Sequence, residues 1–415
     1  MTSLTKWTRP ITLFSDSSPD EREATTMQPP GTQTGRGHAP VGAAGAGGSG
    51  TCLVVDAGRT RCRAALYAGD ADRPVGRADG PGLPGVADGD GSAGPFAAAL
   101  VQLVAGLSMS AGPLDAVCVG MTGVLRPGPA AAAVGEAVRK LLPARRVLVT
   151  SDVVTGYCGA VGLGPGVVVA AGSGMIALAA GPLGVARVDG WGYLLGDAGS
   201  GFEIGRRGLA AALRAHDGRG GSALLAELAE EAFGPLDEVV EAVYGAGNPV
   251  GAVAAFAARV AEAARRGDPH ALDLWADAVT QVAETALAAA ARALGPAPPA
   301  AAGNGRRGRD GGPSSGAAAG GGPGAAGHPA LVDGDPAAGA RAALSWTGGL
   351  FDATDLLLEP FLARVSAARP DLAARPPLGS ALVGGYRLAV APAGHPLLDL
   401  VLVSGSEKWP SENAY

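Results

Sequence analysis

The stretch GWGYLLGDAGSGFEIG, residues 190–205, decides between two interpretations of a glycine-rich chain. It places six glycines, one tryptophan and two acidic residues in sixteen positions. Because 68 of the 415 residues are glycine, composition alone can produce such a cluster. The alternative is a backbone shaped for a ligand, since residues without a Cβ let the main chain approach a bound molecule closely. The surrounding motifs favour the second interpretation.

Composition limits the class of protein. The chain is long enough for two domains and a substantial core. Hydrophobic residues make up 47% of it but aromatic residues only 4%, so alanine and valine must do most of the packing. A net charge of −6 argues against general affinity for nucleic acid. The cysteines lack C-x-x-C spacing and fit reduced core thiols better than disulfides or a zinc site. They are Cys52, Cys62, Cys118 and Cys158.

The sequence also bears on location. The first fifty residues contain acids and prolines rather than a continuous apolar segment, so we expect no secretory signal. Apolar runs such as residues 167–171 are short and interrupted by glycine, which argues against a membrane span. We therefore expect a cytoplasmic protein that binds neither nucleic acid nor membranes.

Three segments are predicted to lack structure of their own. They are an N-terminal tail over residues 1–50, a flexible insertion over about 296–330, and a C-terminal tail over 392–415. Such glycine-, proline- and polar-rich segments bury too little apolar surface to offset the entropy of ordering. The remaining chain divides into an N-terminal lobe over 51–160 and a C-terminal lobe over 161–391.

Between these segments the pattern is α/β. Short apolar strands are expected at 51–58, 61–69, 74–80, 116–123, 146–152 and 166–181. Helices are expected at 94–107, 131–142, 205–214, 222–233, 250–266 and 270–294. Strand hairpins followed by alternating strands and helices indicate two mixed α/β lobes rather than one open sheet.

Three glycine turns follow predicted strands: DAGRT at 56–60, AAGSGM at 170–175 and TGGLFD at 347–352. Small residues at such positions let successive backbone N–H groups converge on phosphate oxygens. An aspartate at the end of the first strand can hold Mg²⁺, usually through water. None of these turns is a Walker A or dinucleotide motif, and each alone is a weak signal.

Five segments in this order resemble the motifs of the BadF/BadG/BcrA/BcrD-type ATPases, in particular their N-acetylglucosamine kinase branch within the actin-like sugar-kinase superfamily. The segments are VVDAGRTRCRAAL, VTSDVVTGYCGAVG, VAAGSGMIAL, GWGYLLGDAGSGFEIGRRGL and SWTGGLFD. The resemblance runs from about residue 51 to 391, interrupted by the insertion. It implies a two-lobed actin-like ATPase with ribonuclease H-like lobes, which binds Mg·ATP and a sugar in the cleft between them.

The resemblance also implies site residues. Asp152 is the expected general base that takes the proton of the attacking sugar hydroxyl; the structural alternative is a helix cap. Asp56 is the expected Mg²⁺ residue, with an ordinary hairpin turn as its alternative. The expected nucleotide and phosphate contacts are Gly58, Arg59, Thr60, Gly172, Ser173, Gly174, Gly348 and Gly349. The expected sugar contacts are Gly190, Trp191 and Asp197, although Trp191 is also compatible with a buried structural role.

Four positions depart from the family pattern. Arg59 stands where a second glycine is common, and Met175 replaces a small polar residue. Ala198 stands where a glutamate is usual, and Leu83 where an asparagine often reaches the sugar. Losing that amide removes a donor and an acceptor that discriminate hydroxyl from N-acetyl groups. The identity of the sugar is therefore open.

Three hypotheses follow. The first is an ATP-dependent kinase of N-acetylglucosamine or a related hexosamine that acts at the 6-hydroxyl; the resemblance also suggests a homodimer. The second is a non-catalytic or degenerate sugar- or nucleotide-binding paralogue, because fold alone does not fix function. The third is an activator ATPase of a dehydratase, which needs closely placed cysteines facing the cleft. Cys118 and Cys158 lie on separate predicted core segments, so the sequence favours the kinase.

Overall fold

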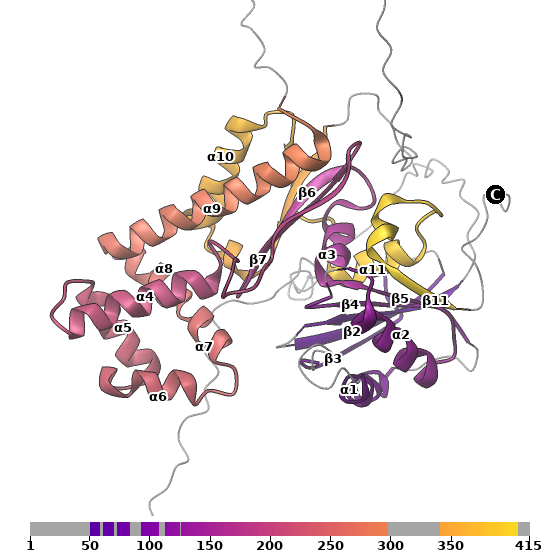
Figure 1. Cartoon of the computed structure of the whole chain (residues 1–415), viewed down its shortest axis with the longest axis horizontal. Helices are drawn as coiled ribbons and strands as arrows, with labels where there is room; N and C mark the ends of the chain where they lie inside the picture. The colour runs from indigo at the N-terminus through magenta and orange to yellow at the C-terminus, as the bar shows by residue number, and fades with distance from the viewer. Residues whose placement is uncertain are drawn as a thin grey trace, which may run out of the picture.

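The computed structural model describes residues 50–58, 61–69, 73–83, 93–107, 113–124, 126–297 and 341–405. They form two lobes, each built on a mixed β-sheet, as Figure 1 shows. The expectations for residues 1–49, for most of the 296–330 insertion and for residues 406–415 lie outside the described residues. The predicted two-lobed α/β architecture is confirmed.

The first sheet has the strand order β11-β5-β4-β1-β2-β3. Its strands are β1 (Thr51–Ala57), β2 (Arg61–Ala68), β3 (Gly76–Pro81), β4 (Leu114–Met121), β5 (Ala144–Ser151) and β11 (Leu402–Gly405). Alternate residues of each strand face opposite sides of the sheet. Leu53 and Val55 of β1 pack with α1 (Gly94–Val104) and α2 (Pro129–Leu141). Cys52 and Val54 pack with α3 (Asp152–Val161) and α11 (Ala381–Ala389).

The second sheet has the strand order β10-β9-β6-β7-β8. Its strands are β6 (Gly166–Ala171), β7 (Met175–Gly181), β8 (Gly184–Asp189), β9 (Ala343–Thr347) and β10 (Ala373–Ala374). The helices of this lobe are α4 (Gly201–His216), α5 (Ala223–Phe233), α6 (Val239–Tyr244), α7 (Pro249–Ala255), α8 (Ala257–Arg265), α9 (Pro269–Leu294) and α10 (Glu359–Ala368). Short helical turns complete the described chain: η3 (Leu236–Glu238), η4 (Gly349–Asp352), η5 (Thr354–Leu358) and η6 (Pro396–Leu400).

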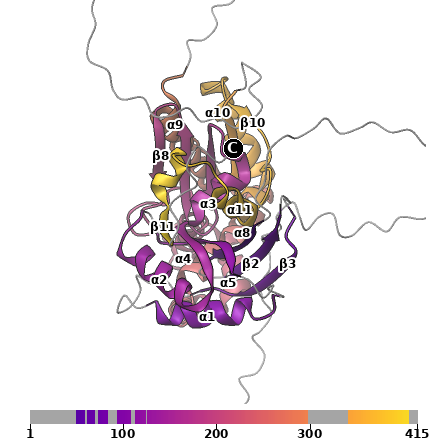
Figure 2. The ribbon, with the colours of Figure 1, turned by 90° about the vertical axis from the view of Figure 1, so that its right-hand side faces the viewer.

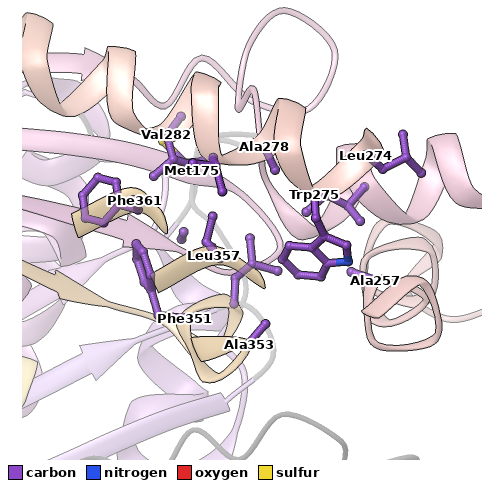
Figure 3. Close-up of a cluster of buried hydrophobic side chains, with 14 of the residues drawn as sticks. Met175, Ala257, Leu274, Trp275, Ala278, Val282, Phe351, Ala353, Leu357 and Phe361 are labelled. Carbon is purple, nitrogen blue, oxygen red and sulfur yellow. The ribbon is translucent and has the colours of Figure 1, made fainter. Parts of the chain in front are cut away.

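Alanine fills much of the core of the second lobe, as the 4% aromatic content predicts. Figure 3 shows the cluster around Trp275 of α9, with Phe351, Leu357 and Phe361 packed nearby. Trp275 is 1% exposed and lies in the centre of this core. The predicted helix over 250–266 is instead two helices, α7 and α8, which meet at Phe256.

Helices α3 and α11 cross closely where the two sheets meet, and both views of the ribbon place them side by side (Figures 1 and 2). A Cβ on Gly384 of α11 would overlap the carbonyl oxygen of Thr155 in α3. A Cβ on Gly159 of α3 would likewise overlap the carbonyl oxygen of Ser380. Arg387 donates from Nη1 to the carbonyl oxygens of Cys158 and Gly159, at 3.0 and 3.1 Å. Glycine is therefore required here for backbone contact.

The C-terminal part of the chain returns to the first lobe. Strand β11 pairs antiparallel with β5, with Leu402 opposite Val149, and α11 packs on β1 and β4. The segment over 392–405, which the sequence predicts to be part of a tail, therefore contains η6 and a strand of the first sheet. The structure corrects that boundary because β11 completes the edge of the sheet beside β5.

The cysteine thiols are buried as predicted, but their arrangement differs from the expectation. Cys118 and Cys158 were expected to lie apart; instead they pack with Cys52 in one cluster on the α3 side of the first sheet. Burial raises the pKa of the Cys118 thiol well above its ordinary value, and the two neighbouring thiols add to that shift. These are protonated core groups rather than ligands that face a cleft.

Candidate active site

The carboxyl ends of three parallel strands meet at one edge of the first sheet. Ala57 of β1 lies beside Met121 of β4, and Met121 lies beside Ser151 of β5. Thr122, one residue past β4, donates its backbone N–H to the carbonyl oxygen of Ala57 at 3.3 Å. This edge therefore brings the ends of the first and second predicted motifs together.

Asp152 is the first residue of α3, directly after β5. Its Oδ2 accepts a hydrogen bond from Thr122 Oγ1 at 2.7 Å. Its Oδ1 accepts from Ser151 Oγ at 3.1 Å and from the Val153 backbone N–H at 2.8 Å. Ser151 also caps the helix, since its hydroxyl accepts from Val153 N–H. The cap predicted as the alternative role of Asp152 thus belongs to Ser151, and Asp152 is held by a hydroxyl from the neighbouring strand.

Asp56 lies near the end of β1, opposite Arg63 in the antiparallel β1–β2 pair. Arg63 Nη2 donates to Asp56 Oδ2 at 2.8 Å, and the Asp56 side chain is only 14% exposed. Gly58 follows, and its carbonyl oxygen accepts the Leu83 N–H at 3.0 Å. The expected phosphate contacts Arg59 and Thr60 lie outside the described residues.

The turn over residues 172–174 joins β6 to β7 in the second sheet. It is here called the phosphate turn after the contact that the sequence predicts for it. The carbonyl oxygen of Gly172 accepts Gly201 N–H at 2.8 Å, and that of Ser173 accepts Phe202 N–H at 3.2 Å. The turn is therefore tied to the first two residues of α4. Nearby, Gly348 has a φ of +99°, and a Cβ there would overlap the carbonyl oxygen of Ala171. The third and fifth motifs thus lie side by side.

The opening stretch forms a loop between β8 and α4, here called the glycine loop (residues 190–200), and two aspartates organise it. Asp189 has a φ of +59° and Asp197 a φ of +58°. Asp189 accepts the N–H groups of Asp197 and Ala198 at 2.8 and 3.1 Å. Asp197 in turn accepts Gly192 N–H at 3.1 Å. Next to Ala198, where the resemblance implies a glutamate, the structure has the carboxylate of Asp189.

Asp197 is the buried acid of this loop. It is 8% exposed, and a Cβ on Gly174 of the phosphate turn would lie 2.8 Å from its Oδ2. Burial raises the pKa of the Asp197 carboxyl, and the Asp189 charge adds to the increase. Hydrogen bonds from the Gly192 and Met175 backbones act in the opposite direction. The third and fourth motifs therefore meet at Asp197.

This shift predicts a pH-dependent effect of the substitution Asp197→Asn. A raised pKa in the folded state means that ionised Asp197 destabilises the fold at neutral pH and that the cost disappears when the group is protonated. Asparagine tolerates positive φ and keeps an oxygen for Gly192 N–H. We expect the variant to unfold roughly 2 °C higher than the parent at pH 7, with no advantage below about pH 4.

The measurement is the melting temperature of both proteins across that pH range. The exposed acid Asp237, changed to asparagine, serves as the control because its side chain is 86% exposed. A melting temperature of Asp197→Asn at or below that of the parent at pH 7 contradicts the assignment of a desolvated carboxylate.

The glycine loop also borders a cavity of about 180 Å³ between the lobes. Ser151 and Val153, which flank Asp152, line it from the first lobe. Trp191 lines it from the second lobe and is 62% exposed, so its predicted alternative as a buried structural residue is wrong. The two residues that flank Asp152 therefore border the same cavity as Trp191.

Two of the departures from the family pattern lie in cores. Leu83 is 6% exposed and packs in the core of the first lobe, and Met175 is 1% exposed in that of the second. Of the two arginines after the glycine loop, Arg207 pairs with Asp277 at 2.8 Å on the surface. The apolar side chains at 83 and 175 thus have a packing role of their own.

Sequence analysis missed three polar residues of this site. Thr122 was recognisable as a hydroxyl directly after an apolar strand, and Asp189 as a second acid beside the glycine loop. Arg187 carried no such signal, because a lone arginine usually faces solvent. Within the described ranges, no group of three or more His, Cys, Asp or Glu side chains is placed to hold a metal ion. No helix in the described part of the chain has the length and apolarity to cross a membrane.

Comparison with known proteins decides the family. The model of the BadF/BadG/BcrA/BcrD ATPase family matches residues 54–299, more than half of the chain. The chain belongs to this family. That match confirms the resemblance drawn from the five motifs.

Individual relatives agree with the assignment. An N-acetylmuramic acid/N-acetylglucosamine kinase of Clostridium acetobutylicum is 31% identical over 120 residues, which span 29% of this chain and 39% of that protein. A candidate N-acetylglucosamine kinase from Chromobacterium violaceum superposes with a TM-score of 0.56 at 26% identity, covering 82% of this chain and 98% of its own. A Porphyromonas gingivalis structure of the same description, 16% identical, shares the fold at a TM-score of 0.55 over 81% and 98% of the two chains.

Proposed function

We propose that this protein is an ATP-dependent kinase of N-acetylglucosamine or a related hexosamine, and that it transfers the γ-phosphoryl group of Mg·ATP to the 6-hydroxyl. The observation that carries the proposal is the position of Asp152, which accepts a hydrogen bond from Thr122 and lies between Ser151 and Val153, two residues that line a cavity enclosed by both lobes. The glycine turns at the ends of nearby strands would provide backbone N–H groups for the phosphates. The names of the relatives support the same chemistry.

Asp152 would act as the general base. A carboxylate accepts hydrogen bonds at about four lone-pair positions, and Thr122, Ser151 and Val153 use three of them. One position remains for the sugar hydroxyl. The three donors fix the orientation of the carboxylate, so it can hold the hydroxyl in line with the phosphorus and accept its proton during transfer.

Backbone groups would bind the phosphates. The phosphate turn and Gly348 lie side by side at the end of the second sheet, and glycine there leaves no Cβ between the main chain and a phosphate oxygen. Gly58, Arg59 and Thr60 would approach from the first lobe, and Gly349 would contact the adenosine. Such contacts stabilise the charge that moves onto the leaving oxygens.

The residues present fit a magnesium ion. Mg²⁺ in kinases is commonly held by one or two carboxylates together with water and substrate phosphates, so a dense acidic cluster is not required. Asp56 supplies a largely buried carboxylate near the end of β1. The end of β1 lies at the same edge of the first sheet as the end of β5, which Asp152 follows. Asp56 would hold the ion, which supplies charge neutralisation to the phosphates. Arg63, paired with Asp56, fixes the direction of that carboxylate.

The sugar would lie against the glycine loop. Trp191 offers an aromatic face at the cavity, and Asp197 a carboxylate for sugar hydroxyls. The backbone of Gly190 would pass beside the ring. Closure of the lobes over the sugar would exclude water and limit wasteful hydrolysis of ATP. We propose a cytoplasmic location, where ATP is supplied, and a homodimer.

A second candidate is a non-catalytic sugar- or nucleotide-binding paralogue. The ion pair between Arg63 and Asp56 favours it, because it engages one oxygen of the carboxylate that the kinase needs for magnesium. The activator ATPase has no comparable support, since the cysteine cluster lies in the core.

ADP release from the purified full-length chain tests the proposal. The assay contains Mg·ATP and, in separate reactions, N-acetylglucosamine, glucosamine, N-acetylmannosamine, N-acetylmuramic acid, glucose or no sugar. We expect turnover that depends on a hexosamine, and mass analysis of the product after selective cleavage locates the phosphate. ATP binding without turnover on any of these sugars would favour the non-catalytic paralogue instead.

A further inference from the structure

The cavity between the lobes, here called the interlobe cavity, is lined by three arginines. Arg126 follows β4, Arg187 lies on β8, and Arg292 lies in the last turn of α9. The cavity volume is about 180 Å³, and among the described residues that line it there is no aspartate or glutamate. Three like charges around a small space repel one another unless an anion enters.

Arg187 is the most confined of the three. Its guanidinium stacks on the Trp191 ring, 4.2 Å from the centroid, and its Nη1 is buried with no hydrogen-bond partner in the described part of the chain. Burial and the nearby charge of Arg126 lower the pKa of Arg187, while Asp189 acts in the opposite direction. The oxygens of Asp189 already accept two backbone N–H groups of the glycine loop. A buried donor without an acceptor is costly, so its position at a cavity points to a bound acceptor.

The position of Arg187 separates this cavity from the phosphate turn. Arg187 lies opposite Leu178 in the β7–β8 pair, three residues along β7 from Met175, where the turn ends. At about 3.4 Å per residue this is roughly 10 Å down the strand. The cavity is instead bordered by Ser151, Val153 and Trp191, which flank the proposed base and the proposed sugar wall.

We propose that the interlobe cavity binds an oxyanion carried by the sugar, so that the preferred substrate is an acidic hexosamine rather than a neutral one. The inference deepens the proposed kinase function and rests on it. Arg187 would bind the oxyanion through its planar guanidinium, which suits carboxylate and phosphate alike. Arg292 would contribute charge at the opening, where its Nη1 already donates to the Arg187 carbonyl oxygen at 3.3 Å.

The test compares three substrates in the ADP-release assay. N-acetylmuramic acid carries a carboxylate on an ether arm, N-acetylglucosamine 1-phosphate carries a phosphate, and N-acetylglucosamine is neutral. We expect kcat/KM for one of the two acidic sugars to exceed that for the neutral sugar at least tenfold, and the better of the two identifies the source of the oxyanion. Equal values for all three would overturn the inference while leaving the kinase in place.

Two substitutions test whether the arginines cause the preference for an acidic sugar. Arg187→Met keeps an unbranched apolar side chain beside Trp191 but removes the guanidinium and its charge, and we expect it to lower the acidic-to-neutral ratio of kcat/KM by roughly 10- to 100-fold. Arg292→Met, which replaces an exposed arginine, should also lower this ratio. It provides the test if Arg187→Met does not fold. The control is Arg139→Met, an exposed arginine on α2, outside the cavity. An unchanged ratio in both cavity variants would overturn the inference.

Direct titration separates failure of this inference from failure of the kinase. N-acetylmuramic acid and N-acetylglucosamine 1-phosphate are titrated into the intact chain by calorimetry, with and without ADP. If no sugar is phosphorylated, arginine-dependent binding of one acidic sugar still supports the anion site, whereas failure of both to bind overturns it.

Discussion

Replacing Asp152 with asparagine is expected to lower sugar-dependent turnover by about 10³-fold while leaving ATP affinity within about twofold of the parent. Removal of a general base typically costs about 10² to 10⁴ in rate. The amide has nearly the shape of the carboxylate and keeps one oxygen for Thr122 or Val153. The variant therefore tests proton acceptance rather than packing, and it is measured by steady-state ADP release together with calorimetric titration of ATP.

The neighbouring hydroxyl provides a graded comparison. Thr122→Val removes the 2.7 Å hydrogen bond to Asp152 but leaves the carboxylate, so we expect a smaller loss of kcat, about tenfold, with little change in sugar KM. The exposed substitution Asp237→Asn should leave turnover unchanged. Near-parental turnover in Asp152→Asn would remove this residue from the mechanism and leave the non-catalytic paralogue as the better account.

The substitution Gly159→Ala is expected to destabilise the protein by about 3 kcal/mol or to prevent folding. Its Cβ would overlap the backbone carbonyl of Ser380, with the Gly379 carbonyl oxygen 2.9 Å away. A backbone carbonyl cannot rotate aside as a flexible side chain can, so α3 and α11 must separate. Overpacking of this kind usually costs about 1–3 kcal/mol and sometimes more. Denaturant or thermal unfolding of the purified chain measures it.

Gly156, three residues earlier in α3, is the matched control. Apart from its chain neighbours and the backbone of its own helix, no heavy atom lies within 4 Å of its ideal Cβ position. Gly156→Ala should therefore stabilise the protein by roughly 0.5–1 kcal/mol, because alanine has the higher helix propensity. We therefore expect the same glycine-to-alanine change to lower the free energy of unfolding at residue 159 and to raise it at residue 156. Equal effects at the two positions would mean that α3 and α11 do not touch as closely as the structure shows.

Much of the fold follows from local sequence patterns. Most strands of the two sheets, the phosphate turn and the order of the motifs were predictable, because apolar strands that end in glycine or aspartate are marked by residue type. The position of Asp152 at a strand end was predictable for the same reason. The break between α7 and α8 at Phe256 was not, since both helices have continuous helical composition and only tertiary packing divides them.

The features that were not predictable depend on contacts between residues far apart in the sequence. Strand β11 has four residues and pairs with β5 some 250 positions earlier, so nothing local distinguishes it from a polar tail. The contacts of Cys118 with Cys52 and Cys158 require strand register and helix placement together. The position of Arg187 at a cavity was not predictable either, because the cavity forms only when four separate segments bring Arg187 together with Trp191, Arg126 and Arg292.

The return of the C-terminal segment to the first sheet means that the chain passes between the lobes twice, once after α3 and once between β10 and α11. The two connections are joined to each other, since Leu378 N–H of the second donates to the Ala160 carbonyl oxygen at the end of α3, at 3.0 Å. Two adjacent connections joined by a hydrogen bond resist twisting and sliding of one lobe against the other far more than they resist bending. We therefore expect relative motion of the lobes to follow mainly one rotation, which would open and close the space beside Asp152.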